Sequence, residues 1–200
     1  VNFDPRGPNS QATLDSVSVA IAATGALMPF VNYTGTGYAN TTFGEGIYNV
    51  DISISNLSQL SPATDSMGVY NFQSTLATSD TYELTAEKLE ESYLNGVSAA
   101  DIIFISRHIL GIEPFTDPLK RIAADVDRNS KITTLDLIQI RKLILGIDTE
   151  LEHQPPWIFV NADYQFSNPT KPYDEVYNEH ATKITIDFSQ PYSLDFIGIK

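Results

Sequence analysis

Alternating apolar and polar residues run through the first part of the chain. Residues 48–54 alternate strictly, as expected for a strand with one buried face. Apolar positions also recur within 14–21, and the segments 69–72 and 81–84 follow clusters of Ser, Asp and Gly that favour turns. Short strands separated by turns predict a β-sandwich over residues 1–86.

The middle of the chain has a helical period instead. Apolar residues recur three or four positions apart within 102–110 and within 137–145. A glycine follows each run, at Gly111 and Gly146, where a helix C-terminal cap is expected. The pattern therefore predicts two helices of similar length.

These two stretches form an internal repeat. Residues 97–112 match residues 132–147 at a constant offset of 35 positions, so one supersecondary unit is used twice. We expect helices near 99–110 and 134–145 that pack against each other. Their predicted shared core is Ile102, Ile105, Ile109, Leu137, Ile140 and Ile144.

Strand patterns return after residue 153. Candidate strands cover 157–160, 184–188 and 193–199, and five prolines interrupt the region. Three strands alone bury too little surface to be stable. We therefore expect residues 153–200 to be a C-terminal β extension that packs on the sandwich or on a neighbouring subunit.

Charged residues follow the same division. Residues 1–78 hold six of them, residues 79–152 hold 22 and residues 153–200 hold nine. The change in composition supports a sandwich domain at 1–86 and a helical repeat domain at 87–152, followed by the β extension. The predicted fold class is mainly β with a small α part.

Overall composition excludes several functions. The chain has 12 Lys and Arg against 25 Asp and Glu, and its net charge of −13 argues against nucleic acid as a partner. It contains no cysteine, which excludes disulfides, thiolate catalysis and cysteine-based metal sites. Residues 16–44 carry no charge, but Gly, Pro and Asn interrupt them, so we expect no membrane span.

Motifs for catalysis are also missing. The sequence has no nucleophile elbow, P-loop, dinucleotide fingerprint or His-Glu-x-x-His motif. Acidic pairs occur, as in any acidic protein, but none is distinguished as a glycosidase pair. We predict that the protein is not an enzyme.

The most informative segment is residues 125–136. Oxygen-bearing side chains occupy loop positions one, three, five, nine and twelve, with a main-chain carbonyl at position seven, which is the ligand spacing of an EF-hand. The predicted Ca²⁺ ligands are Asp125, Asp127, Asn129, the Lys131 carbonyl, Thr133 and Asp136. We expect Thr133 to act through a water molecule.

Two positions of this loop depart from the EF-hand pattern. Ser130 replaces the Gly usually needed at the sharp turn, which costs backbone strain, and Asp136 replaces a longer bidentate Glu. The alternative is a polar turn that only caps the next helix through Thr133 or Thr134. The repeated unit upstream favours the calcium site.

That upstream copy lacks part of the ligand pattern. Asp101 corresponds to Asp136, but Leu94 stands at position five, where its side chain cannot bind a metal. A second, weaker Ca²⁺ site would use Glu90, Glu91, Asn95 and Asp101, helped by main-chain carbonyls. A solvated acidic turn explains the same residues equally well, and both interpretations stay open.

The paired units resemble dockerin type I repeats, in which a calcium loop ending in Asp is followed by one helix and then Leu-Gly. Residues 93–147 look like the dockerin-like region of large secreted proteins of Bacteroidetes-type bacteria, and so do residues 157–164 and 195–200. Residues 64–72 are similar to the Thr-Asp-x-x-Gly-x-Tyr-x-Phe pattern of carboxypeptidase-regulatory-like and Cna-B-like (Ig-like) sandwich domains. Residues 1–44 resemble no family that we can name.

The resemblance implies Ca²⁺ as the cofactor, an extracellular, secreted location and a non-catalytic role in assembly. In dockerins, loop positions ten and eleven help to select the cohesin partner. Here they are Ala99-Ala100 in one copy and Thr134-Leu135 in the other, so a symmetric dual binding mode is not expected.

Three functions fit these observations. The first is a calcium-stabilised subunit of a bacterial surface fibre or filament, in which residues 1–44 exchange strands between copies, unless they complete the sandwich of their own chain. The second is a dockerin-type adaptor that binds a cohesin-like β-sandwich. The third is a carbohydrate-binding module. Its stacking platform would be Trp157, Tyr164, Phe166 and Tyr173, although packing is the simpler use of these side chains.

Glycosylation is a further hypothesis. Asn32, Asn40 and Asn56 each begin an Asn-x-Ser/Thr sequon. Ser16 and Ser66 lie in Asp-Ser-apolar sequences that look like the O-glycosylation pattern of Bacteroidetes-type secreted proteins. The alternative is that all five are ordinary strand and turn residues.

Overall fold

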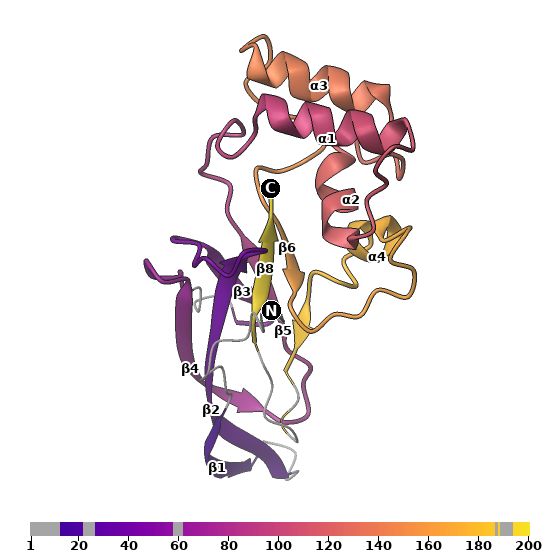
Figure 1. Ribbon diagram of the computed structural model, residues 1–200. Coiled ribbons are helices and arrows are strands. Elements are labelled where there is room, and N and C mark those ends of the chain that lie inside the picture. The colour runs from indigo at the N-terminus through magenta and orange to yellow at the C-terminus, as the bar shows by residue number, and fades with distance from the viewer. Residues whose placement is uncertain (1–12, 22–26, 58–61, 187, 189–193) are drawn as a thin grey trace. The chain divides into compact units, whose positions relative to one another are not determined.

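The computed structural model describes most of the chain and divides it into two compact units (Figure 1). The described residues are 13–21, 27–57, 62–186, 188 and 194–200, with only the backbone for 13–21 and 27–29. The first unit comprises residues 1–87, 161–163 and 182–198, and the second comprises 88–160, 164–181 and 199–200. Residues from the C-terminal part of the chain therefore belong to both units.

Strands build the first unit. They are β1 (Thr13–Ile21), β2 (Leu27–Thr41), β3 (Asp51–Ile54), β4 (Val69–Ala77), β5 (Glu83–Glu87), β7 (Ile184–Thr185) and β8 (Phe196–Ile199), whose last residue belongs to the second unit. The segments predicted as strands around residues 14–21, 48–54, 69–72 and 81–84 all contain strand residues. Of the uncharged residues 16–44, which we did not expect to span a membrane, 16–21 lie in β1 and 27–41 lie in β2.

The long strand β2 organises the larger sheet. It pairs antiparallel with β1 from Thr34 to Leu27 and antiparallel with β4 from Phe30 to Tyr38. Beyond that point it pairs in parallel with β8, where Ala39 lies opposite Phe196. A side chain at Gly37 would overlap the Leu194 carbonyl group, so glycine permits the close approach of the segment before β8.

A second sheet consists of β3, β5 and β7 in that order, and both pairings are antiparallel. Buried positions alternate along β3, as the sequence pattern predicted, with Ile52 and Ile54 facing inward. The fully buried side chains of the first unit come from both sheets and include Tyr33, Ile52, Tyr70, Leu76, Leu84, Ile184, Leu194 and Phe196. Segments 182–186 and 194–198 of the C-terminal part thus complete the core of the first unit.

The regular elements of the second unit are mainly helices. They are α1 (Ala99–Ile109), α2 (Pro118–Ala124), α3 (Thr134–Ile144) and the short α4 (Tyr173–Tyr177), with strand β6 (Ile158–Asn161) mostly in this unit. The two sheets and the helical region confirm the predicted mainly β fold with a smaller α part. The predicted helices 99–110 and 134–145 are α1 and α3, which lie side by side (Figure 1).

Two helices were not predicted. The dipeptide Asp117-Pro118 is a helix start signal: Asp117 caps α2 by accepting a hydrogen bond from the Leu119 main-chain N–H at 2.8 Å. Helix α4 has five residues and no side-chain cap, so it is too short to show a period. Among the described residues, no helix is both long and apolar enough to cross a membrane.

The two copies of the repeat have the same helix caps and the same helix ends in the structure. Ser98 and Thr133 cap α1 and α3, each through a reciprocal capping box with the Asp three residues later. Gly111 and Gly146 end the two helices with positive φ angles of 70° and 66°. The core between the helices is a cluster of buried Ile105, Ala124, Val126 and Ile140, against which all four other predicted core residues pack, namely Ile102, Ile109, Leu137 and Ile144.

Candidate metal centre

Three carboxylates meet in the loop between α2 and α3. Asp125, Asp127 and Asp136 each place an oxygen within 4.8 Å of the others. Asp125 and Asp136 are fully buried, although Asp is almost never buried without a partner. Asp125 directly follows α2, and Asp136 is the third residue of α3, so two helix ends bring the carboxylates together.

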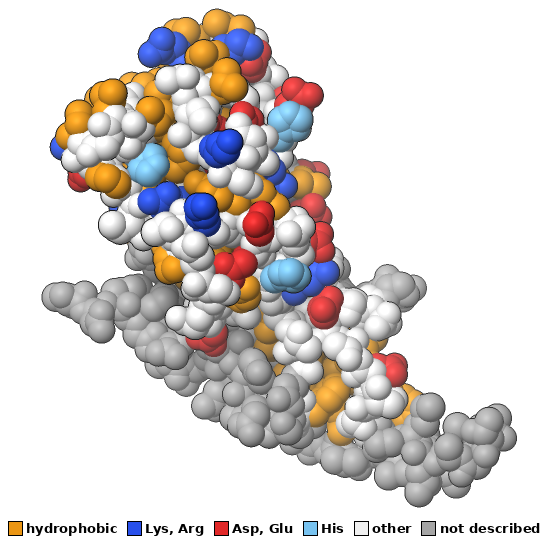
Figure 2. Space-filling view, turned by 90° about the vertical axis from the view of Figure 1, so that its right-hand side faces the viewer, with side chains coloured by type: hydrophobic (Ala, Val, Ile, Leu, Met, Phe, Trp, Pro, Cys, Tyr) orange, Lys and Arg blue, Asp and Glu red, His pale blue; other side chains and the backbone are white. Residues whose placement is uncertain are grey.

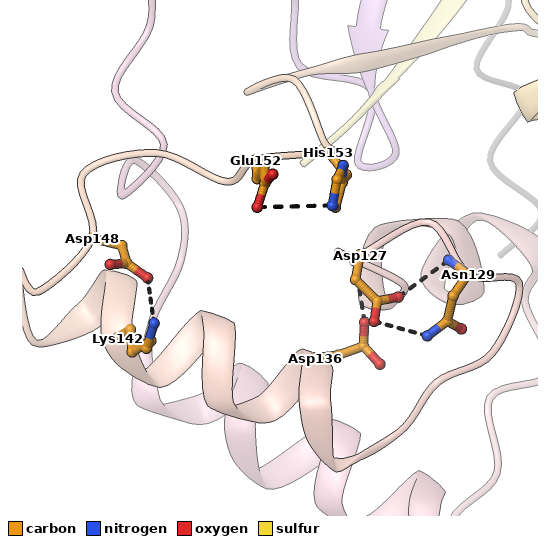
Figure 3. Close-up of polar contacts among 7 residues, drawn as sticks. All are labelled: Asp127, Asn129, Asp136, Lys142, Asp148, Glu152 and His153. Atoms are coloured by element: carbon orange, nitrogen blue, oxygen red, sulfur yellow. Dashed lines mark hydrogen bonds and ion pairs between the residues drawn. The ribbon is translucent and has the colours of Figure 1, made fainter.

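Main-chain hydrogen bonds to Asp136 close the loop. Its Oδ1 accepts hydrogen bonds from the N–H groups of Val126 at 2.9 Å and Asp127 at 3.3 Å, and its Oδ2 accepts one from Thr133 at 2.7 Å. Figure 3 shows the contact between Asp127 and Asp136. Asp136, the last residue of the loop, is therefore hydrogen-bonded to residues two and three of the same loop. The same side chain forms the capping box of α3, so the position of the loop and the start of the helix are fixed together.

The middle of the loop turns around the other two carboxylates. The Asn129 N–H donates to Asp125 Oδ1 and to Asp127 Oδ1, both at 3.1 Å, and the Ser130 N–H donates to Asp125 Oδ2 at 2.9 Å. The Asn129 side-chain amide also donates to Asp127 Oδ2 at 2.8 Å (Figure 3). Ser130 has a φ of 66°, which is the left-handed conformation expected at loop position six and unfavourable for a residue other than glycine.

Burial makes the ionised form of these carboxylates less favourable. Burial, together with the nearby Asp136 carboxylate, raises the pKa of Asp125 to about 6, although hydrogen bonds to this carboxylate act in the opposite direction. Burial also raises the pKa of Asp136. A divalent cation would offset the repulsion, and oxygen donors are the ligands that Ca²⁺ prefers. The donor set therefore fits Ca²⁺.

The other predicted ligands lie in the same loop. Asn129 and Lys131 are exposed, and Thr133 is partly buried. The Thr133 hydroxyl accepts a hydrogen bond from the Leu135 N–H at 3.1 Å and donates to Asp136 Oδ2 at 3.3 Å. Thr133 thus caps α3, as the polar-turn alternative requires, while it stands at loop position nine. Capping and metal binding are compatible uses of this loop.

The loop and both repeat helices fall within a recognised family model. Residues 95–145 match the dockerin type I domain. No curated protein and no solved structure matches the chain. Dockerin domains bind Ca²⁺, and the buried cluster of Asp125, Asp127 and Asp136 lies inside the matched residues. The carboxypeptidase-regulatory-like or Cna-B-like assignment of the sandwich stays a prediction.

The first repeat of the dockerin-like region does not assemble a comparable cluster. Within the described parts of the chain, the Asp125 cluster is the one group of three or more metal-binding side chains. Asp101 accepts the Ser98 N–H at 2.8 Å in the cap of α1. Asn95 donates to Glu91 at 2.7 Å and thereby lowers the Glu91 pKa, and Glu90 is exposed. These contacts favour the acidic-turn interpretation of the four residues predicted as a second site.

The dockerin-like loop also has a contact that the sequence did not reveal. The Tyr177 hydroxyl of α4 donates a hydrogen bond to Asp125 Oδ2 at 2.9 Å. Burial raises the pKa of Tyr177, so the hydroxyl keeps its proton and acts as a donor. The two residues are 52 positions apart, and no motif in the sequence links them.

The residues of the predicted stacking platform are used in packing. Trp157 stacks on Phe159 with 6.1 Å between ring centroids, and the Lys200 ammonium group lies 4.8 Å from the Trp157 ring centre. The Tyr164 and Phe166 rings pack edge to face on each other, and both also pack against a buried cluster that includes Ile122 and Ile158, while Tyr173 is buried. This arrangement favours the packing interpretation of these aromatic residues.

The glycosylation candidates differ in accessibility. Asn56 and Ser66 are exposed in turns of the first unit. Asn32 lies on β2, where its side-chain carbonyl accepts a hydrogen bond from Thr75 at 2.8 Å. Asn40 is buried, so the folded strand leaves no room for a glycan there. Ser16 lies in β1, where only the backbone is described.

Proposed function

We propose that the chain is a non-catalytic, extracellular adaptor whose dockerin-like region binds Ca²⁺ and a cohesin-like protein. The observation that carries this proposal is a pair of exposed apolar surfaces on α1 and α3, related by the 35-residue repeat. The match of residues 95–145 to the dockerin type I domain supports the same conclusion. Oxygen ligands at EF-hand spacing support the calcium requirement.

The two surfaces consist of equivalent residues with similar exposure. Ile103 is 58% exposed and its repeat mate Ile138 is 50% exposed, and Leu110 and Leu145 are 71% and 65% exposed. Ile112 and Ile147 continue the pair beyond the helix ends. Figure 2 shows hydrophobic side chains on the surface of the helical region. Apolar groups gathered in this way are characteristic of interaction sites.

Each apolar surface contains one basic residue at the same place. Arg107 pairs with Glu113 at 3.0 Å, and Lys142 pairs with Asp148 at 3.2 Å, again 35 residues later. Each of these basic residues precedes the exposed leucine after its helix by three positions, so both lie on the same helix face. An apolar centre with a charged rim is the usual composition of a protein interface, which supports a protein partner over a glycan.

The two surfaces are not equal in every position. Loop positions ten and eleven are Ala99 and Ala100 at the start of α1, but Thr134 and the exposed Leu135 at the start of α3. The calcium loop directly precedes α3 and shares Asp136 with its cap. We therefore propose that α3 makes the dominant contact and that Ca²⁺ is required because it holds the start of this helix.

The adaptor has more support than the filament subunit. Strands β1 and β2 pair with each other, and β2 pairs with β4, so residues 13–21 and 27–41 are used in the sheet of their own chain. Residues 1–12, which begin the segment predicted to exchange strands, lie outside the described residues. Neither observation supports exchange of strands between copies, whereas the family match supports the adaptor.

Binding to a panel of purified cohesin β-sandwiches tests the proposal by calorimetry with Ca²⁺ and with excess chelator. We expect at least one cohesin to bind with Ca²⁺ and none with chelator. Ile138→Asp should weaken binding more than Ile103→Asp, since α3 carries the dominant contact. Phe43→Asp is the matched control because Phe43 is an exposed apolar residue of the first unit. Full binding by a variant that carries both Ile→Asp changes would disprove the proposed surface.

A further inference from the structure

Helix α4 contacts the calcium loop from outside the residues that match the dockerin domain. Besides its hydrogen bond to Asp125 Oδ2, the Tyr177 hydroxyl lies 3.4 Å from the Asp125 main-chain carbonyl oxygen, which it also approaches as a donor. Asp125 stands at loop position one, and both residues belong to the second unit. A single side chain therefore contacts both oxygen-bearing groups of the first ligand.

The geometry points to Tyr177 as a positioning residue of the calcium centre: we propose that its hydroxyl holds Asp125 in the orientation that binds Ca²⁺, and that calcium binding in turn orders α4. This inference rests on the calcium binding proposed above. A carboxylate has about four acceptor positions on its two oxygens. The Tyr177 hydroxyl and the N–H groups of Asn129 and Ser130 use three of those on Asp125, which leaves a position for a cation. Such outer partners orient ligands and affect metal affinity.

The loop also holds Tyr177 through a second contact. The Arg128 guanidinium group, at loop position four, lies 5.0 Å from the centre of the Tyr177 ring. Arg128 has a φ of 53°, which is an uncommon backbone conformation for a residue other than glycine. The tyrosine is thus held by a hydrogen bond to one loop residue and by a cation–π contact to another.

The other side of Tyr177 is anchored in the second core cluster. Tyr177 packs against a group of buried residues from α2, β6, α4 and the chain beyond them, namely Ile122, Ile158, Val160, Val176, Ala181 and Ile199. Its ring also lies 6.1 Å from that of Tyr173, one helical turn earlier. Because the Tyr177 ring packs against this core, its hydroxyl is held in position next to Asp125.

Tyr177→Phe removes the hydroxyl and keeps the ring. We expect it to weaken Ca²⁺ binding roughly 10-fold, the low end of the effect of an outer-shell partner, in calorimetric titrations of the full chain. Tyr164→Phe is the matched control: Tyr164 donates to the Glu175 carboxylate at 2.9 Å in the same unit, but Glu175 is not a loop ligand. The control should bind Ca²⁺ like the wild type.

A second readout follows from the reciprocity of coupled sites. Ca²⁺ should slow amide hydrogen exchange in residues 173–181 of the wild type, and this protection should be lost in Tyr177→Phe. Should that variant fail to fold without Ca²⁺, Arg128→Gln tests the other contact and should weaken binding two- to three-fold. Wild-type affinity in whichever variant folds would overturn the inference while leaving the proposed calcium site intact. A wild-type chain that binds no Ca²⁺ would overturn both.

Discussion

Asp125 and Asp136 stand at the two ends of one loop, and both carboxylates are fully buried. The Asp136 carboxylate accepts the N–H of Val126, the residue directly after Asp125, at 2.9 Å. Folding therefore brings together two acidic side chains that repel each other unless they are protonated or bind a cation. The stability of this protein should depend on both calcium and pH.

Removal of calcium should destabilise the second unit. A ligand that binds only the folded state stabilises it by about 2.7 kcal/mol at 100 times Kd, so excess chelator should lower the melting temperature measured by calorimetry. Asp125→Ala should abolish most of this difference because it removes a charged ligand. Glu152→Gln, which changes an exposed acidic side chain, serves as the control and should keep it. An unchanged melting temperature after complete calcium removal would show that the loop is only a polar turn.

The calcium-free protein should lose stability as pH rises. Burial raises the pKa of Asp125 to about 6 in the folded state, above the unfolded value of about 3.9, so the folded state binds this proton more tightly. The stability from this group is present below about pH 4 and is lost as pH rises through about 6. Urea unfolding in chelator at several pH values measures the slope. It should be flatter in Asp125→Asn, and equal slopes would refute the assignment.

Calcium affinity should have the opposite pH dependence. Only the deprotonated carboxylate binds the metal, so protonation of Asp125 competes with Ca²⁺ below about pH 6. The apparent Kd measured by calorimetry should therefore increase as pH falls from about 7 to 5. A pH-independent Kd over this interval would show that Asp125 is not a ligand.

Truncation of Ile140, in the core between the repeat helices, should lower the free energy of unfolding. This side chain is buried against Ile105 and Val126, so Ile140→Ala should cost roughly 2–5 kcal/mol of unfolding free energy, measured by denaturant titration. Ile138→Ala, two residues earlier on the exposed surface, should cost less than about 0.5 kcal/mol. Similar costs at the two positions would mean that the inward face of α3 is wrongly assigned.

Ser130→Gly should stabilise the protein. Ser130 has a φ of 66°, and a residue other than glycine costs about 1 kcal/mol in this conformation. Its N–H bond to Asp125 would be retained. Ser66→Gly is the control, since Ser66 has no positive φ and glycine there should only add flexibility to the unfolded chain. Thermal unfolding that ranks Ser130→Gly below the wild type would contradict this account of the strain.

The local features of the second unit could be read from the sequence alone. The helical period and the glycines after each helix predicted α1 and α3 within one residue at each end. The loop spacing identified Asp125, Asp127 and Asp136, which the fold brings together. Such features depend on residues fewer than about a dozen positions apart, so the covalent chain itself nearly determines their geometry.

Other features depended on tertiary structure. Asp101 and Asp136 have the same capping box, yet only Asp136 is buried beside two other carboxylates, of which Asp125 directly follows α2. The Tyr177–Asp125 hydrogen bond and the parallel pairing of β8 with β2 join residues 52 and about 157 positions apart. No local pattern encodes these contacts, because the packing of distant apolar surfaces decides which polar groups meet.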